Sequence, residues 1–301
     1  MSFHSFGQKF ADKDYYLVDS LVYENIKPIN LSCSSFAKFS IALVWPKYNR
    51  WIYDYTREKL KDPQEDTTQF KMKQALAGAI YYIGWSYSVQ TDYEKCIFYY
   101  EQCEKIYIEI GDSIGIANSL DNIGNIYLIK GESAKALDYF EESLTIRKNI
   151  GHELGTASSL NSIGSTYMEH GDYSSALKEF ERALELYDKV DFISGISSVL
   201  NNLGIIESHF GNYEVALSYF KRSLDTKDMI GDKQGKAMSL SQIGMNHIHL
   251  EEYARALTYF EQALILYKEV GDKQGAAGSL SNMGYIHRLQ SRYDEAINYF
   301  N

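Results

Sequence analysis

The chain has 301 residues, of which 45% are hydrophobic, and its formal net charge is -10. This charge would repel a phosphate backbone, and no Lys or Arg cluster offsets it locally, so the composition argues against direct binding of nucleic acid. Only three prolines occur, all before residue 64, which favours helices in the rest of the chain.

Residues 1–66 lack the internal period that marks the rest of the sequence. Pro28, Pro46 and Pro63 separate two stretches, each of which can form an amphipathic helix with an aromatic face. We predict that this segment is a helical N-terminal cap, because the open end of a repeat stack is an uncovered core. A small, separate interaction module is the alternative.

The most apolar early stretch, FAKFSIALVW at 36–45, is too short to span a bilayer. No basic segment followed by an apolar run indicates a secretion signal. Cys96 and Cys103 lie seven residues apart on one expected helix, so their Cα atoms should be about 10 Å apart, beyond disulfide reach. We therefore expect no membrane segment, reduced thiols packed as small residues, and a cytoplasmic location.

The remainder, 67–301, repeats with a period of 40 residues. GDKQGKAMSLSQIG at 231–244 returns as GDKQGAAGSLSNMG at 271–284, and one glycine recurs every 40 residues from Gly84 to Gly284. A fixed period of this length is the signature of stacked repeats. We predict six copies, the last one truncated: about 71–110, 111–150, 151–190, 191–230, 231–270 and 271–301.

Each copy contains two helices. In 111–150, apolar residues keep helical spacing up to Gly131, and a second set begins at Ala136. Gly111 suits the left-handed residue that closes one helix, and Asp112 can cap the next. Gly124, in mid-helix, costs about 1 kcal/mol relative to Ala, so we expect it to lie where the paired helix crosses closely. The fold class is therefore all-α, an α-solenoid.

The order of small and large residues in this copy resembles the tetratricopeptide repeat, here in a 40-residue form: Leu120, Ile123, Gly124, Tyr127, Ala136, Phe140 and Ser143. The arrays it is most similar to belong to animal spindle-orientation scaffolds and to bacterial sensor proteins. The resemblance covers 71–301 and implies a right-handed superhelix. It also implies that the first helix of each pair lines the concave surface, while the second faces outward.

The charge distribution agrees with this assignment of the two helices. Five first-helix windows hold 6 charged residues in 85, and four second-helix windows hold 23 in 68. Amide and hydroxyl side chains replace the charges, and amides can bond the backbone of a peptide whatever its side chains are. The alternative is that they satisfy backbone groups within the array. The predicted groove comprises Asn118, Asn122, Asn125, Ser158, Asn161, Ser162, Ser165, Asn201, Asn202, Gln242, Met245, Asn282 and Tyr285.

Catalytic and metal sites receive little support from the sequence. His247 and His249 are two residues apart and point to different faces of a helix, and His247 and His287 are better explained as core substitutes for Tyr. GDKQGKA lacks the spacing of a phosphate-binding loop, and neither GxSxG nor HExxH occurs. We expect no enzyme activity, no cofactor and no metal.

The chain stops at Asn301, midway through an expected second helix. We therefore expect a fragment of a longer protein, or self-association through the uncapped last repeat. The sequence favours a scaffold that binds a protein or peptide partner in the concave groove. The alternative is the sensory arm of a larger signalling protein, such as a histidine kinase, nucleotide cyclase or transcription regulator, whose output domain lies outside this chain.

Overall fold

The computed structural model describes residues 49–50, 52–61 and 66–300. Most of the expected N-terminal cap lies outside these ranges, and its role stays a prediction. The chain divides into two compact units, residues 1–130 and 131–301. No strand occurs in the described ranges, which confirms the all-α expectation.

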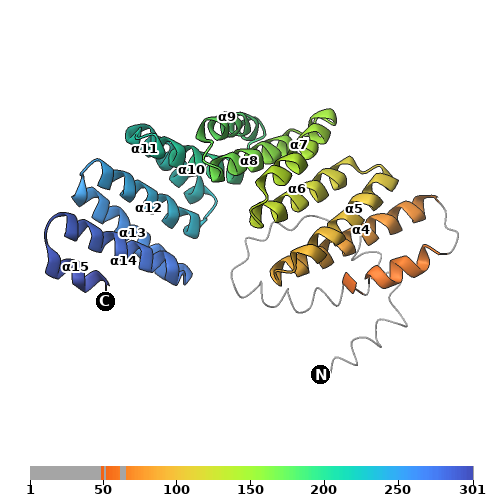
Figure 1. Ribbon diagram of the computed structural model, residues 1–301, viewed down its shortest axis with the longest axis horizontal. Coiled ribbons are helices and arrows are strands. Elements are labelled where there is room, and N and C mark those ends of the chain that lie inside the picture. Colours follow the sequence, from red (N-terminus) through yellow and green to blue (C-terminus); the bar gives the residue numbers. More distant parts are fainter. Residues whose placement is uncertain (1–48, 51, 62–65, 301) are drawn as a thin grey trace, which may run out of the picture. The chain divides into compact units, whose positions relative to one another are not determined.

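The helices follow one another as pairs in both units (Figure 1). In unit 1, residues 52–59 are helical, and α4 (Asp66–Val89), α5 (Tyr93–Ile110) and α6 (Ser113–Ile129) follow. Unit 2 contains α7 (Ser133–Asn149), α8 (Glu153–Glu169), α9 (Tyr173–Lys189), α10 (Ile193–His209), α11 (Tyr213–Met229), α12 (Lys233–His249), α13 (Tyr253–Val270), α14 (Lys273–Leu289) and α15 (Tyr293–Phe300).

The junction between repeats has the geometry expected from its Gly-Asp pair. Gly111 has a φ of 70° and closes α5, and the Asp112 carboxylate accepts a hydrogen bond of 2.9 Å from the Gly115 N–H. Where the sequence has Asp191 and Phe192 instead, Asp191 takes the left-handed conformation at a φ of 52° and the side chain of Phe192 makes no cap. Aspartate tolerates the left-handed conformation better than most non-glycine residues, and the Phe192 ring packs on the Tyr187 ring with centroids 5.5 Å apart.

The recurrent mid-helix glycine lies against the ring of the paired helix, as predicted. A Cβ atom on Gly164 would lie 2.9 Å from the Phe180 ring, and one on Gly204 would lie 2.6 Å from the Phe220 ring. Carbon atoms cannot approach this closely without displacement. Glycine is therefore required by the crossing of α8 with α9 and of α10 with α11.

The second glycine series has a different partner, which the sequence did not reveal. Gly195 lies under the Tyr187 ring, where a Cβ would be 2.6 Å from the ring, and Gly235 lies under the Lys227 chain, with 2.9 Å to its Cδ. These glycines let a long side chain from the preceding second helix cross the next first helix. Their role is contact between successive repeats.

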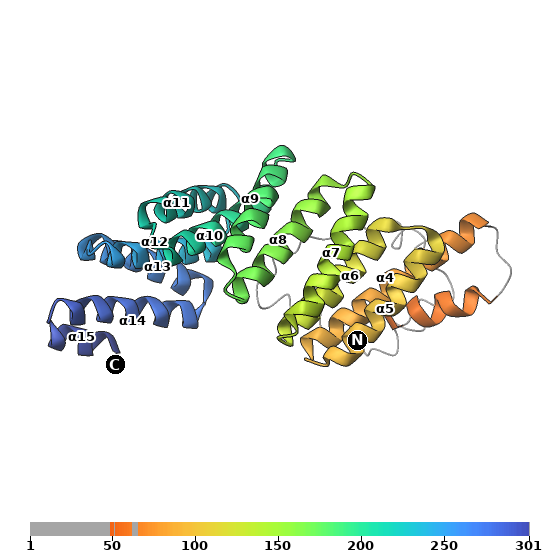
Figure 2. The same cartoon turned by 45° about the horizontal axis from the view of Figure 1, so that its top comes forward.

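The first helices of unit 2 line its shorter, concave side. In succession α8, α10, α12 and α14 touch one another, whereas the second helices α7, α9, α11 and α13 make no contacts of that extent with each other. Figure 2 shows the same stacking from another direction. This agrees with the arrangement that the resemblance implies and that the charge distribution supports.

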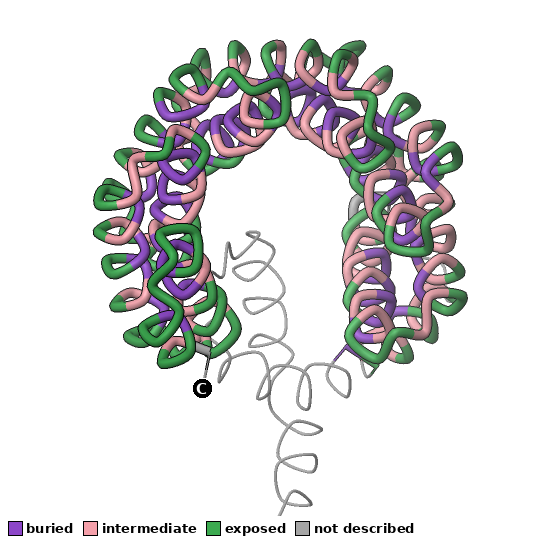
Figure 3. The backbone as a smooth tube through the Cα atoms, turned by 60° about the vertical axis from the view of Figure 1, so that its left-hand side comes forward, coloured by how far each residue is buried: buried purple, intermediate pink, exposed green. Residues whose placement is uncertain are grey.

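The core of unit 2 runs through the stack between first and second helices. Phe180, Phe220 and Phe260 are completely buried, and each has a completely buried alanine one turn earlier on its helix. In Figure 3 the buried residues follow the interior of the stack, while exposed residues lie at the turns and on outward sides. No single pair encloses such a core, so each repeat depends on its neighbours.

Candidate functional site

The residues of the predicted groove are called the stripe from here on. In unit 1 the stripe lies on α6, and one of its side chains makes contacts within the fold. Asn118 and Asn125 are exposed, whereas Asn122 is half-buried. The Asn122 Nδ2 donates to the Asn118 carbonyl at 2.6 Å, and its side chain also hydrogen-bonds the Tyr81 hydroxyl of α4. For Asn122 these contacts favour the structural alternative.

In unit 2, the predicted residues share one environment along the concave side. Each is half-buried on a first helix, so part of its side chain reaches solvent. None of them is charged, and α8, α10, α12 and α14 each contribute at least two. The set comprises Ser158, Asn161, Ser162, Ser165, Asn201, Asn202, Gln242, Met245, Asn282 and Tyr285.

Two amides of this stripe hold an unsatisfied acceptor. The Oδ1 atoms of Asn161 and Asn201 are buried and accept no hydrogen bond within the described part of the chain. Buried polar atoms are nearly always paired, so an unpaired acceptor requires an explanation. Both residues occupy the same repeat position on neighbouring helices, α8 and α10, which makes the feature recurrent.

The stripe becomes more apolar toward the C-terminal end. One repeat position carries Ser165, Ile205, Met245 and Tyr285 in successive first helices. Met245 and Tyr285 pack against the core cluster around α13, and the Arg288 guanidinium lies over the Tyr285 ring at 5.0 Å. At this end the stripe therefore presents partly exposed apolar side chains that are packed against the core.

The histidines that replace Tyr are core residues, as predicted. His247 and His287 are 4% and 8% exposed, and each stacks on a tyrosine of the paired second helix with ring centroids 5.2 Å apart. The His247 Nδ1 lies 2.6 Å from a carboxylate oxygen of Glu252. Within the described ranges, no group of three or more His, Cys, Asp or Glu residues could hold a metal ion.

The two helical cysteines are buried and unbridged, as predicted. The Cys96 thiol donates to the Gly84 carbonyl at 2.9 Å, and the Cys103 thiol to the Ala77 carbonyl at 3.3 Å. Burial raises the pKa of Cys96 to about 11 and also raises that of Cys103. Both groups stay protonated at neutral pH and are poor nucleophiles.

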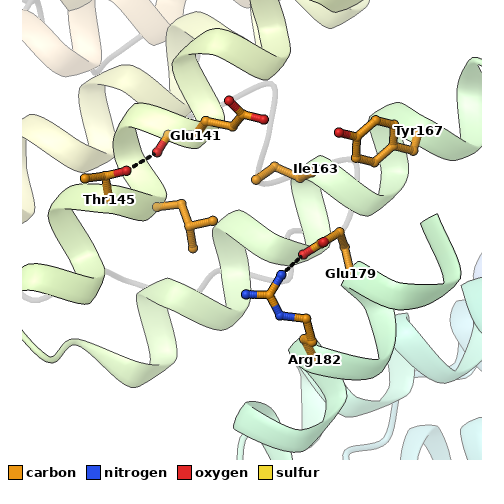
Figure 4. Close-up of a pocket in the computed structure, with 7 residues that line it drawn as sticks. Glu141, Thr145, Ile163, Tyr167, Glu179 and Arg182 are labelled. Atoms are coloured by element: carbon orange, nitrogen blue, oxygen red, sulfur yellow. Dashed lines mark hydrogen bonds and ion pairs between the residues drawn. The ribbon is translucent and has the colours of Figure 1, made fainter. Parts of the chain in front are cut away.

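A pocket lies away from the stripe, and sequence reasoning missed it. It has a volume of about 290 Å³ and opens between α7 and α9, above α8 (Figure 4). Its charged residues belong to the solvated faces of second helices, where the repeat pattern gave no reason to single them out. The lining consists of Glu141, Leu144, Thr145, Ile163, Tyr167, Glu179 and Arg182.

The family follows from the repeats themselves. A model of the tetratricopeptide repeat matches residues 76–149, 134–189, 155–229 and 235–301. The chain belongs to the tetratricopeptide repeat family. Repeats of this family generally serve as protein-interaction modules. No curated protein matches the sequence.

Several solved structures share the tetratricopeptide repeat fold of this chain. BtubC (BKLC) from P. vanneervenii matches with a TM-score of 0.66 and 16% identity, over 76% of this chain and 92% of that one. A signal transduction ATPase with numerous domains from Pyrococcus horikoshii, which has a tetratricopeptide repeat sensor, matches with a TM-score of 0.66 and 18% identity, over 92% of this chain and 44% of that one.

A Rap protein complexed with competence and sporulation factor has the same fold. It matches with a TM-score of 0.58 and 13% identity, over 87% of this chain and 93% of that one. At these identities the similarities concern the fold. Among the described residues, no helix of this tetratricopeptide repeat protein is long and apolar enough to cross a membrane.

Proposed function

We propose that the chain binds a protein or peptide partner along the first helices of its repeats, on the concave side of unit 2. The observation that carries this proposal is the pair of unsatisfied amide acceptors on Asn161 and Asn201. A bound polypeptide brings backbone N–H donors, and a small rotation of either side chain would let its Oδ1 accept one. Two equivalent amides on adjacent helices suit a chain that crosses both.

The composition of the surface supports a ligand recognised through its backbone. Because the stripe of unit 2 is uncharged, charge on the partner contributes little to binding there. A Rap protein of the same fold was solved with competence and sporulation factor, which supports ligand binding as a use of this architecture. The partner remains defined by its chemistry, an extended or helical polypeptide.

In the alternative function, the same surface binds the partner, but the chain acts as the sensory arm of a larger signalling protein. In a sensory arm, partner binding would alter the activity of a domain outside this chain, and the similar signal transduction ATPase from Pyrococcus horikoshii has a tetratricopeptide repeat sensor. Activity of the complete gene product, measured with and without the captured partner, separates an arm from a scaffold. No catalytic role is proposed for the described residues.

The test compares two amide substitutions of matched chemistry. Purified chain serves as bait, and the affinity of a captured partner is measured for wild type, for the double variant Asn161→Ala with Asn201→Ala, and for Gln262→Ala. Gln262 is an exposed amide on α13, on the outer side. We expect binding about two- to tenfold weaker for each lost hydrogen bond in the double variant, and no change in the control.

Circular dichroism and thermal melting of the same three proteins separate binding from stability. Loss of affinity with an unchanged melting temperature supports the proposal. Unchanged affinity with a lowered melting temperature would mean that these amides serve the array itself, and the proposed groove would then be wrong.

A further inference from the structure

The pocket between α7 and α9 lies on the outer side of unit 2 and is independent of the proposed groove. Two second helices form its walls and the first helix α8 forms its floor (Figure 4). Its volume of about 290 Å³ is near the lower end of the range for small-molecule sites, about 300 Å³. A single side chain or a small ligand fits this space.

The deepest part of the pocket is apolar and packs against the core. Ile163 is only 4% exposed, and Leu144 packs against the core cluster of α8 to α10. The half-buried Tyr167 packs on the same cluster and adds an aromatic ring. These three residues can cover a short hydrocarbon segment, which is the part of a ligand that gains most from leaving water.

The rim of the pocket is acidic, and one of its acids is already neutralised. Glu179 accepts a hydrogen bond of 2.6 Å from Arg182, in the ion pair drawn in Figure 4. The Glu141 carboxylate has no ion pair in the described part of the chain, and the Thr145 hydroxyl donates to the Glu141 backbone carbonyl at 2.9 Å. One uncompensated carboxylate therefore stands beside the apolar floor.

The charged groups that act on the Tyr167 hydroxyl are carboxylates. Burial is the main cause that raises the pKa of the Tyr167 hydroxyl. The negative charges of three carboxylates raise it further: Glu141, Glu179 and Asp172. An anionic ligand is disfavoured beside these carboxylates, whereas a cation is attracted by the carboxylates and by the face of the ring.

We infer that this pocket binds an alkylammonium group, with the hydrocarbon chain on Leu144 and Ile163 and the ammonium between Tyr167 and Glu141. Two sources carry this chemistry, a lysine side chain of a partner and a free polyamine. Arg182 competes for the same acidic rim, because it already holds Glu179. Replacement of Arg182 should therefore strengthen the binding of a cation, whereas it would have no such effect in a purely apolar pocket.

The probes are pentylamine, pentanol and pentanoate, each titrated into the full chain with ¹³C-labelled methyl groups. We expect pentylamine to shift the Ile163 methyl signals saturably at millimolar concentration, and the other two probes to shift them little. Cadaverine and a capped tripeptide with a central lysine then distinguish the sources. Binding of cadaverine alone indicates a free amine, and binding of both indicates a lysine side chain.

Charge variants test the assignment of each residue. Glu141→Gln should weaken pentylamine binding about three- to tenfold at low salt, as expected for loss of one charge near the surface. Arg182→Gln should strengthen binding by a similar factor, because it frees Glu179. The matched control is Glu261→Gln, an exposed glutamate at the same repeat position on α13, which should leave binding unchanged.

Three outcomes would overturn the inference. Equal binding of pentanol and pentylamine would indicate a merely apolar pocket. Weaker pentylamine binding by the Arg182→Gln variant would mean that the arginine supports the pocket and does not compete with the ammonium for Glu179. Absence of any shift at Ile163 in a protein with unchanged helical circular dichroism would mean that the pocket binds none of these groups.

Discussion

At the scale of single residues, one repeat position, buried in four of its five copies, contributes a long side chain to each contact between repeats. Three of the five equivalent positions carry tyrosine, and the other two carry Arg147 and Lys227, which are 5% and 6% exposed. Arg147 donates to the Gly155 carbonyl at 2.7 Å, and Lys227 donates to the Ser239 hydroxyl at 3.0 Å. Neither bond involves a carboxylate.

Burial of this position disfavours the charged form of Lys227. Burial lowers the pKa of its ammonium, and the charge of Asp232 raises it by a smaller amount. A lysine with a lowered pKa in the folded state releases its proton there while the unfolded chain still holds one. Between the folded pKa and the unfolded value of about 10.4, the unfolded chain binds more protons, so stability rises with pH.

We predict that Lys227→Met stabilises the chain by about 1 kcal/mol at pH 7, because methionine fills the same space without a buried charge. The advantage should shrink at pH 9.5, as the wild-type lysine loses its proton. Urea unfolding of both proteins at the two pH values measures this. Lys221→Met, at an exposed lysine of α11, should show neither effect. Equal destabilisation at both pH values would mean that the ammonium is well stabilised.

At the scale of helices, the crossing of the two members of a pair depends on one glycine. On Gly204 a Cβ would meet the Phe220 ring at 2.6 Å, whereas on Gly278, in the middle of α14, it would meet nothing within 4 Å. Both glycines lie in helices, where alanine is more favourable than glycine by about 1 kcal/mol. The two sites therefore separate packing from propensity.

We predict that Gly204→Ala destabilises the chain by about 1 to 3 kcal/mol, since displacement of the ring outweighs the gain in propensity. Gly278→Ala should instead stabilise it by up to about 1 kcal/mol. Thermal melting of both variants gives the comparison. If Gly204→Ala proved as stabilising as Gly278→Ala, the close crossing of α10 and α11 would be wrong.

At the scale of the whole molecule, stability is expected to vary along the stack. Helices α10 and α11 are flanked by packed neighbours on both sides, whereas α15 has eight residues and packs on α14. Tyr293 and Ile297 of α15 are 61% and 55% exposed. Stability in a repeat array is roughly a sum of local and nearest-neighbour contributions, so the less flanked helix opens more easily.

We predict that amide hydrogen exchange is faster in 293–300 than in 193–229 by several orders of magnitude, because local opening is cheaper there than global unfolding. Mass spectrometry of peptides from both segments at one pH measures the difference. Uniformly slow exchange through α15 would show that something covers this helix, and sedimentation would then test for a second copy of the chain.

The sequence by itself determined the fold class, the pairing of helices and the side that each helix faces. These features recur every 40 residues, so the same pattern can be recognised in several copies. The mid-helix glycine is an example, because Gly164 and Gly204 lie against equivalent rings. The caps, such as Asp112, could also be predicted, because they depend only on neighbours along the chain. The peptide-binding role of the stripe stays a prediction.

Only the tertiary structure decided which side chains meet between repeats. The lining of the pocket comes from three helices, and nothing in the solvated pattern of α7 and α9 indicates that Glu141 and Glu179 act on one tyrosine. The contacts of Asn122 and the unpaired oxygens of Asn161 and Asn201 likewise depend on neighbouring helices. Periodicity specifies which face of a helix is buried, whereas rotamers and helix spacing decide which atoms touch across it.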